Sequence, residues 1–330
     1  MDDGSMKLVS VIVPNYNCGR YLDKCIAHLV DQTYTHLEII ICDDASTDNS
    51  LEIIRSWQKK DGRIRLLTNM RNEGIVKTSN KCLSEANGAY IMMQDADDWS
   101  EPNRVERQVA TLEQYDADMC VTNFVAHYVN GKKGYEEVGP SMLLDIRSKE
   151  IWGATPTLMF RRGILKDIPG YPEYFDRIAG FDRYFIMDIL HKHKGYYLNE
   201  FLYNWLIHPH SDHRSIQLKQ PRYLTKMVSN DIYLELKRQR IETGTDWVKE
   251  NNFDALKKYE QELIKNEELI ADRLRVFACI QIDHGNYKSA RKLLWAAIKT
   301  APFFTRNYYS LIYFIRSKYF GKKTITPGSS

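Results

Sequence analysis

The stretch Ala89-Tyr90-Ile91-Met92-Met93-Gln94-Asp95-Ala96-Asp97-Asp98-Trp99 determines how the first part of the chain is organised. It opens with an apolar run that is typical of a buried strand, and three carboxylates follow within four residues. Because side chains alternate along an extended chain, Asp95 and Asp97 should point to the same side. Carboxylate oxygens are the ligands that Mn²⁺ and Mg²⁺ prefer. The stretch therefore indicates either a divalent-metal site or a solvated acidic turn before a helix that starts near Pro102.

Three other short apolar runs precede this strand, and each is followed by apolar residues at helical spacing. The runs cover residues 8–13, 37–42 and 64–67. Together with 89–93 they predict four alternations of strand and helix, and hence a mostly parallel sheet with helices on both faces. Ligands of such sheets bind where the strands end. We therefore expect the polar residues after each strand to converge on one crevice.

The pattern becomes less regular after Trp99 and purely helical towards the end of the chain. Helices are predicted at 104–115 and 181–190, and strands at 119–129, 155–160, 196–198 and 202–207. From about residue 221 the sequence is charged and helical, without clear strands. We therefore predict an α/β domain over 6–215 and an α-helical region over 216–330. Residues 1–5 are interpreted as a cloning remnant.

The composition limits the class of protein. The 330 residues carry a net charge of +3, which gives no indication of a nucleic-acid ligand. The six cysteines are scattered, without a CxxC pair, so we expect reduced thiols and a cytoplasmic protein. No apolar run in the sequence approaches the roughly 20 residues that a membrane-spanning helix needs.

Four short motifs follow the predicted strands in order. They are Ser10-Val11-Ile12-Val13-Pro14-Asn15-Tyr16-Asn17, Asp43-Asp44-Ala45-Ser46-Thr47-Asp48, Asn72-Glu73-Gly74 and Asp95-Ala96-Asp97-Asp98-Trp99. Over about residues 7–208 this arrangement resembles the family-2 glycosyltransferases with a GT-A fold. The resemblance implies a nucleotide-binding α/β sandwich whose donor-binding half is 6–100 and whose acceptor-side half is 101–215. It also implies metal-assisted transfer, with inversion, of a hexose or an N-acetylhexosamine.

The same resemblance implies the substrates and the cofactor. The donor is expected to be a nucleotide sugar, with a UDP-sugar preferred, and the metal is expected to be Mn²⁺ or Mg²⁺. The acceptor is expected to be a hydroxyl of a glycan or lipid-linked glycan, as in bacterial polysaccharide biosynthesis. A cation across the diphosphate would offset the charge that develops as the glycosidic bond breaks.

Donor-binding roles are carried over from the resemblance position by position. Pro14 and Tyr16 match positions beside the donor base, where an aromatic ring offers a flat apolar face. A turn aromatic packed on the core is the alternative for Tyr16. Asp44 matches the carboxylate that accepts a hydrogen bond from the uracil imide. Asp95 matches an acid near the ribose and the metal, and Asp97 matches the metal ligand that bridges to the diphosphate.

An inverting transfer also needs a general base on the acceptor hydroxyl. Asp182 falls where the family places this base, although Phe181 stands where the family usually carries Glu. A helix N-cap is the alternative role for Asp182, and Asp176 is the second candidate for the base. Asp98 is expected to be structural and to bond backbone amides of the next turn.

A cluster of histidines lies at 208–213. The family often carries Arg-x-His here, in a loop that closes over the diphosphate, and Leu206 stands in place of that Arg. His208 is therefore a candidate for contact with the metal or the phosphate, with His210 as a weaker one, and a zinc site is the alternative. Trp152 either stacks on an acceptor sugar or fills the core.

The end of the chain is aromatic and basic. Residues 303–323 interleave aromatic side chains with Arg306, Arg316, Lys318, Lys322 and Lys323. Such a helix suits the surface of an anionic membrane, and a helix packed on its neighbours with solvated charges is the alternative. Peripheral contact with the inner face of the cell membrane would suit a lipid-linked acceptor.

Two other classes of protein compete with the glycosyltransferase. A nucleotidyltransferase would also use paired acids, but it would show a Gly-rich basic loop after the first strand, where this chain has Pro14-Asn15-Tyr16-Asn17-Cys18-Gly19-Arg20. A non-catalytic scaffold protein of a glycan pathway would be favoured by a degenerate acidic cluster. This cluster is intact, so the enzyme is the preferred hypothesis.

Overall fold

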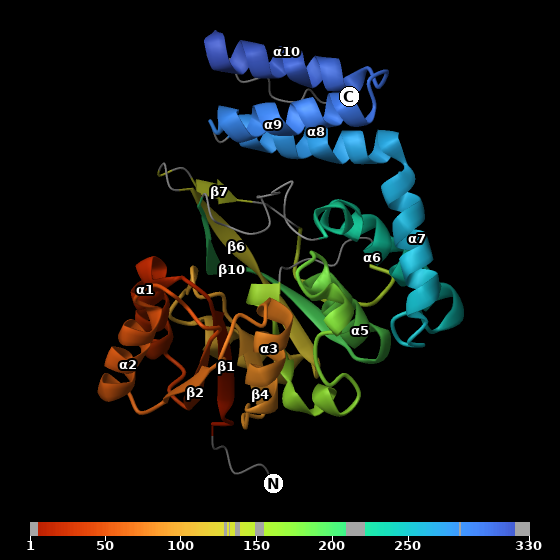
Figure 1. Cartoon of the computed structure of the whole chain (residues 1–330). Coiled ribbons are helices and arrows are strands. Elements are labelled where there is room, and N and C mark those ends of the chain that lie inside the picture. Colours follow the sequence, from red (N-terminus) through yellow and green to blue (C-terminus); the bar gives the residue numbers. More distant parts are fainter. Residues whose placement is uncertain are drawn as a thin grey trace. The chain divides into compact units, whose positions relative to one another are not determined.

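The chain forms two compact units (Figure 1). A computed structural model describes residues 6–128, 131, 133–135, 139–148, 155–208, 222–283 and 285–320. The first unit comprises 1–208 with 237–244, and the second comprises 209–236 with 245–330. The predicted fold class is confirmed, because an α/β unit with a mostly parallel sheet is followed by helices.

The first unit is built on a ten-stranded sheet with the order β3-β2-β1-β4-β9-β6-β10-β5, to which β7 adds on β6 and β8 on β10. Its strands are β1 Val9–Asn15, β2 Leu37–Asp43, β3 Ile64–Thr68, β4 Tyr90–Met93, β5 Trp99–Ser100, β6 Met119–Tyr128, β7 Lys133–Tyr135, β8 Met142–Leu144, β9 Met159–Arg161 and β10 Gly195–Ile207. Strands β3, β2, β1 and β4 are parallel, and β9 runs antiparallel to both of its neighbours. The parallel part therefore coincides with the region of strand–helix alternation.

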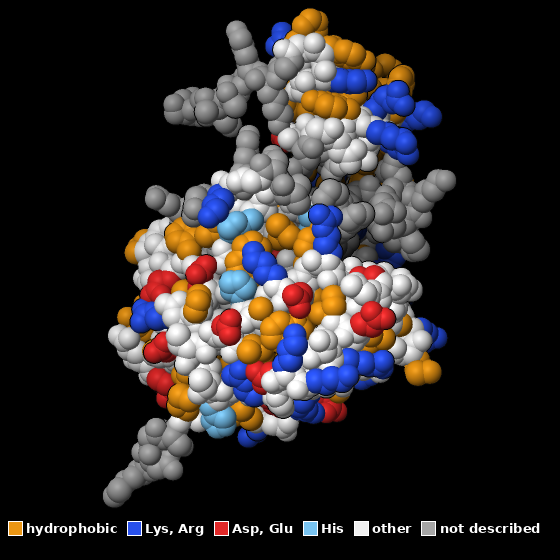
Figure 2. Space-filling view, turned by 90° about the vertical axis from the view of Figure 1, so that its left-hand side faces the viewer, with side chains coloured by type: hydrophobic (Ala, Val, Ile, Leu, Met, Phe, Trp, Pro, Cys, Tyr) orange, Lys and Arg blue, Asp and Glu red, His pale blue; other side chains and the backbone are white. Residues whose placement is uncertain are grey.

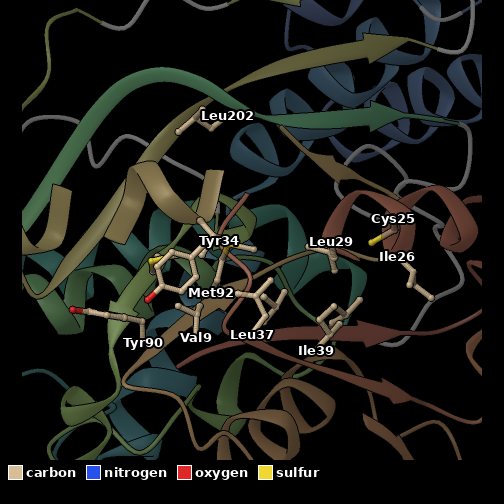
Figure 3. Packing of buried hydrophobic residues seen from close by; sticks show 14 of the residues in the cluster. Val9, Cys25, Ile26, Leu29, Tyr34, Leu37, Ile39, Tyr90, Met92 and Leu202 are labelled. Atoms are coloured by element: carbon tan, nitrogen blue, oxygen red, sulfur yellow. The ribbon is translucent and has the colours of Figure 1, made fainter. Parts of the chain in front are cut away.

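Helices cover the sheet on both faces because its strands are apolar on both sides. The helices of this unit are α1 Gly19–Val30, α2 Ser50–Lys60, α3 Ile75–Ser84, α4 Arg104–Gln114 and α5 Phe181–Lys192. Val9, Val11 and Val13 of β1 join one buried cluster, and Ile12 joins another. In the first cluster the strands pack against α1, which contributes Cys25, Ile26 and Leu29 (Figure 3). In the second they pack against α3 and α5.

Two strand predictions were wrong in detail. The stretches 196–198 and 202–207 form one strand, β10, whose register against β6 shifts between Leu198 and Tyr203. The polar residues between them interrupt the apolar pattern, and a bulge accommodates the interruption. The predicted strand 155–160 begins as a 3₁₀ turn, Thr155–Thr157, and only Met159–Arg161 pairs. Pro156 explains this difference, because proline cannot donate to a ladder.

The second unit is helical. Its helices are α7 Phe253–Lys265, α8 Glu267–Asp283, α9 Tyr287–Thr300 and α10 Arg306–Tyr319, together with the part of α6 Tyr223–Thr243 that precedes residue 237. Helices α8, α9 and α10 pack on one another, and Asn286 caps α9 by accepting a hydrogen bond from the Ser289 amide. Among the described helices, none is both long enough and apolar enough to cross a membrane.

Candidate active site

The polar motifs that follow β1, β2 and β4 meet at one edge of the sheet. These strands are parallel neighbours, with Asn15 opposite Asp43 and Ile12 opposite Met93. The segments that leave them therefore emerge side by side. This edge is where ligands of open α/β sheets bind.

Asp44, directly after β2, anchors the Asn-Glu-Gly motif. Its Oδ1 accepts hydrogen bonds from Asn69 Nδ2 at 2.7 Å and from the Glu73 amide at 2.8 Å. Its Oδ2 accepts one from the Gly74 amide at 2.9 Å. A carboxylate oxygen can accept two hydrogen bonds, so Oδ2 has capacity for a further donor. This anchoring role of Asp44 is not evident from the sequence alone.

Gly74 allows a close approach between two segments of the site. Its φ is +92°, which favours glycine. A Cβ at this position would also lie 2.4 Å from Oδ1 of Asp176. Asp176, the second candidate for the base, therefore lies against the Asn-Glu-Gly motif. Arg177 strengthens this junction by donating to the Asn72 carbonyl at 3.1 Å.

The two residues predicted to border the donor base differ in exposure. Tyr16 is 45% exposed in the loop after β1, so its ring is not packed into the core. Pro14 is buried within β1, opposite Cys42 of β2. Their contacts with a donor stay predictions. Trp152 and His210, which the sequence analysis also singled out, lie outside the described residues.

Asp95, Asp97 and Asp98 form an acidic cluster after β4. One oxygen of each lies within 4.8 Å of the others. Asp98 is buried and accepts hydrogen bonds from the Tyr203 hydroxyl at 2.6 Å and the Leu206 amide at 2.7 Å. The expected partners of Asp98 were amides of the next turn. That expectation was wrong because β10 pairs with β5 directly behind the cluster.

His208, at the end of β10, contacts Asp97. Its Nε2 lies 2.9 Å from Oδ2 of Asp97, and its ring packs on Tyr21 at a centroid distance of 4.6 Å. Two neighbouring ligands of an octahedral ion with bonds of 2.0–2.1 Å are roughly 3 Å apart. The observed separation therefore suits two ligands of one cation. With Asp95 beside them, these residues fit a divalent metal in number and in chemistry.

The crowding of carboxylates is electrostatically costly. Burial raises the pKa of Asp95 to about 8, and the charges of Asp97 and Asp182 add to this effect. Arg104 opposes the rise. A bound cation would lower this pKa, because it favours the ionised form. The electrostatics therefore point to a positively charged ligand.

Arg104 is a site residue that sequence reasoning missed. It is fully buried below the acidic cluster. Its guanidinium donates to five oxygens: Gln94 Oε1, Ser100 Oγ, Gln108 Oε1 and the carbonyls of Met93 and Pro156. These contacts tie the end of β4 to the segment before β9. In the sequence Arg104 looks like an ordinary first-turn residue of a helix, so no local signal identifies it.

Asp182 lies in the first turn of α5. The helix is capped by Gly180 in a left-handed conformation, so the N-cap role considered for Asp182 is not what the structure has. Its Oδ1 accepts a hydrogen bond from the Arg183 amide at 2.8 Å. Burial raises the pKa of Asp182. Its charge in turn raises the pKa of Asp95. The predicted base therefore lies near the acidic cluster.

Comparison with known proteins agrees with this fold. The model of the family described as Glycosyl transferase family 2 matches residues 10–186, more than half of the chain. The glycosyltransferase GlyG of Streptococcus pneumoniae is 40% identical over 118 residues, which cover 36% of this chain and 39% of GlyG. The hyaluronan synthase of Pasteurella multocida is 42% identical over 99 residues, which cover 30% of this chain and 10% of the synthase.

Two solved structures share the fold. Residues 1–349 of TarS from S. aureus, in complex with UDP-GlcNAc, match with a TM-score of 0.60 at 19% identity, covering 98% of this chain and 95% of that one. The mannosyltransferase PcManGT from Pyrobaculum calidifontis, in complex with GDP-Man and Mn²⁺, matches with a TM-score of 0.51 at 14% identity, covering 97% and 89%.

The chain belongs to glycosyl transferase family 2. Its fold is shared by the two solved structures. The alignments span well under two thirds of the length of the two curated relatives. The match over residues 10–186 therefore establishes the family.

Proposed function

We propose that the first unit is a metal-dependent, inverting glycosyltransferase that uses a UDP-sugar donor. The observation that carries this proposal is the grouping of Asp95, Asp97 and His208 in one site with Asp182. The acids offer a place for a metal-bound diphosphate, and Asp182 offers a proton acceptor. The UDP-GlcNAc bound to the structurally similar TarS supports the choice of donor.

In this proposal each polar residue has one role. Asp97 and His208 bind Mn²⁺ or Mg²⁺, and Asp95 lies near the ribose and the metal. The cation, when bound, neutralises charge on the departing diphosphate. Asp182 accepts the proton of the acceptor hydroxyl as the oxygen attacks the anomeric carbon from the face opposite the diphosphate. The bond to the diphosphate breaks as the new glycosidic bond forms, which inverts the configuration.

The other residues predicted to bind the donor would surround its uracil base. Tyr16 supplies an exposed ring for stacking, and Asp44 uses its remaining Oδ2 capacity for the uracil imide. Pro14 lies near the end of β1, two residues before Tyr16. In this arrangement residues 6–100 bind the donor and 101–215 face the acceptor. One of the relatives is by name a hyaluronan synthase, so we propose a glycan or lipid-linked glycan hydroxyl as acceptor.

We also propose peripheral membrane contact through 303–323, on the inner face of the cell membrane. The described part of this segment contains α10, whose buried residues are the polar Asn307, Ser310 and Ser317 together with Phe314. Its outward face instead carries aromatic and aliphatic side chains: Tyr308, Tyr309, Ile312, Ile315 and Tyr319 are all exposed. Three of the four buried residues of α10 are thus polar, whereas a helix that only packs on its neighbours buries mostly apolar side chains.

Basic residues accompany this apolar face. Exposed Lys288, Arg291, Lys292 and Lys299 share one side of α9 with Trp295, which is 59% exposed. In Figure 2 the helical part at the top of the view carries hydrophobic and basic side chains interleaved, as a surface for anionic lipid would.

A hydrolysis assay tests the proposed chemistry. Purified protein is incubated with UDP-GlcNAc, UDP-GalNAc, UDP-Glc, UDP-Gal or GDP-mannose, with Mn²⁺ or with EDTA, and the released UDP or GDP is measured. We expect one donor to be hydrolysed only with metal. Equal release in Mn²⁺ and EDTA would contradict metal dependence, and release from GDP-mannose alone would contradict the UDP donor.

A further inference from the structure

Tyr171 carries a buried hydroxyl that the fold does not use. The side chain is 2% exposed, and its hydroxyl is without a hydrogen-bond partner in the described structure. Buried hydroxyls are nearly always bonded, because a buried group that loses water without a replacement destabilises the fold. An unpaired phenol in a candidate site is therefore a sign of a missing ligand.

Tyr171 is held in place through both its backbone and its ring. Asn80 Oδ1 accepts a hydrogen bond from the Tyr171 amide at 2.8 Å, and Asn80 Nδ2 donates to the Tyr171 carbonyl at 2.9 Å. The ring contacts Phe181 and Phe185 of α5 at centroid distances of 5.4 and 4.5 Å. The hydroxyl is thus preorganised, and it cannot turn towards another partner without breaking this packing.

The phenol lies near the reacting groups. In addition to burial, the charges of Asp182 and Asp95 both raise the pKa of Tyr171. In the proposed reaction Asp182 serves the attacking hydroxyl and Asp95 serves the side of the departing diphosphate. The transferred sugar must lie between these two, because attack and departure occur on opposite faces of its anomeric carbon.

We propose that Tyr171 is a binding residue for the transferred sugar, with its phenol hydrogen-bonded to a sugar hydroxyl. This inference rests on the proposed function and adds the first contact with the sugar itself. A phenol can both donate and accept a hydrogen bond, so it recognises a hydroxyl in either orientation. Its ligand is the sugar and not the nucleotide, which makes the proposal separable from the base-binding roles.

The test compares binding of UDP with binding of the UDP-sugars named above, in Mn²⁺, by calorimetry. For Tyr171→Phe we expect the affinity for the preferred UDP-sugar to fall by about 3- to 10-fold, the effect of one neutral hydrogen bond. The affinity for UDP should not change. The melting temperature should stay equal or rise, because the variant removes only an unpaired hydroxyl.

Tyr184→Phe is the matched control. Like Tyr171, Tyr184 is buried, and it lies on α5. Its hydroxyl, however, accepts a hydrogen bond from Arg240 at 2.9 Å. This variant should lower the melting temperature and leave the ratio of the two affinities unchanged.

Three outcomes would overturn the inference. The first is an unchanged ratio of affinities in Tyr171→Phe, and the second is an equal change of that ratio in Tyr184→Phe. The third is a wild-type protein that binds UDP but binds none of the UDP-sugars more tightly than UDP. Nucleotide binding would then be intact, and there would be no favourable contact with the sugar. A wild-type protein that binds neither would instead overturn the proposed function itself.

Discussion

Nε2 of His208 lies 2.9 Å from Oδ2 of Asp97, although 111 positions separate the two residues in the sequence. Asp98 explains how the contact is maintained, because its carboxylate is bonded to Tyr203 and to the Leu206 amide of β10. The acidic turn and the end of β10 are therefore joined before any ligand binds. A metal ion that takes Asp97 and His208 as ligands would therefore find the two side chains already held next to each other.

The role of Asp182 is tested by Asp182→Asn. Asparagine keeps the shape of the side chain but cannot accept the proton, so hydrolysis of the donor should fall by about 10²- to 10⁴-fold. Affinity for UDP in Mn²⁺ should stay close to that of the wild type. Asp176→Asn is the control, because Asp176 lies against Gly74. If Asp176→Asn loses the activity and Asp182→Asn keeps it, the base is Asp176.

The rate should also depend on pH through the same group. Burial raises the pKa of Asp182 above its ordinary value of about 3.9. Because the base acts only when ionised, kcat should rise as the pH increases through this raised pKa. The rising limb should therefore lie at higher pH than for an exposed aspartate, and Asp182→Asn should lose it. A rate that falls over this range would contradict the role of a base.

Arg104 should matter for stability as well as for the site. In Arg104→Met each of the five acceptors loses the hydrogen bond from Arg104 in a buried environment, which should cost about 3–5 kcal/mol in the free energy of unfolding, measured with urea. Arg107→Met is a suitable control, since Arg107 pairs with Glu200 at the surface and should cost less than about 1 kcal/mol. Similar losses in both variants would show that the buried network contributes little.

Membrane contact is tested with point variants, because α10 packs on α8 and α9 and its removal would expose them. Combining Tyr309→Ser and Tyr319→Ser with Arg291→Glu and Lys292→Glu should abolish co-sedimentation with phosphatidylglycerol vesicles. UDP binding should be retained, and high salt should release much of the wild-type protein. The control variant reverses the charges of Lys59 and Lys60 on α2 by replacing both with Glu. Equal sedimentation of both variants would refute the proposed surface.

The sequence predicted those parts of the fold that depend on local patterns. Val9 to Val13 read as a strand because the strand is buried on both faces, and the acidic turn followed from the strand before it. The structure added what depends on distant contacts. No local sequence pattern around Arg104 reveals its five acceptors. The continuity of β10 is not visible in the sequence either, because polar residues at its bulge interrupt the apolar pattern. In the sequence Tyr171 looks like any core aromatic residue. Only the structure shows that its buried hydroxyl has no hydrogen-bond partner among the described residues.

The most direct test of the account is a titration of UDP, followed by calorimetry, in Mn²⁺ and in EDTA. Wild-type protein should bind UDP about 10- to 100-fold more tightly in Mn²⁺, as expected for charge-assisted contacts. Asp97→Asn and His208→Gln should each reduce this difference, and His36→Gln, at an exposed position, should not. Equal affinities of the wild type in Mn²⁺ and EDTA, or an unchanged difference in Asp97→Asn, would contradict a metal-dependent donor site at this cluster.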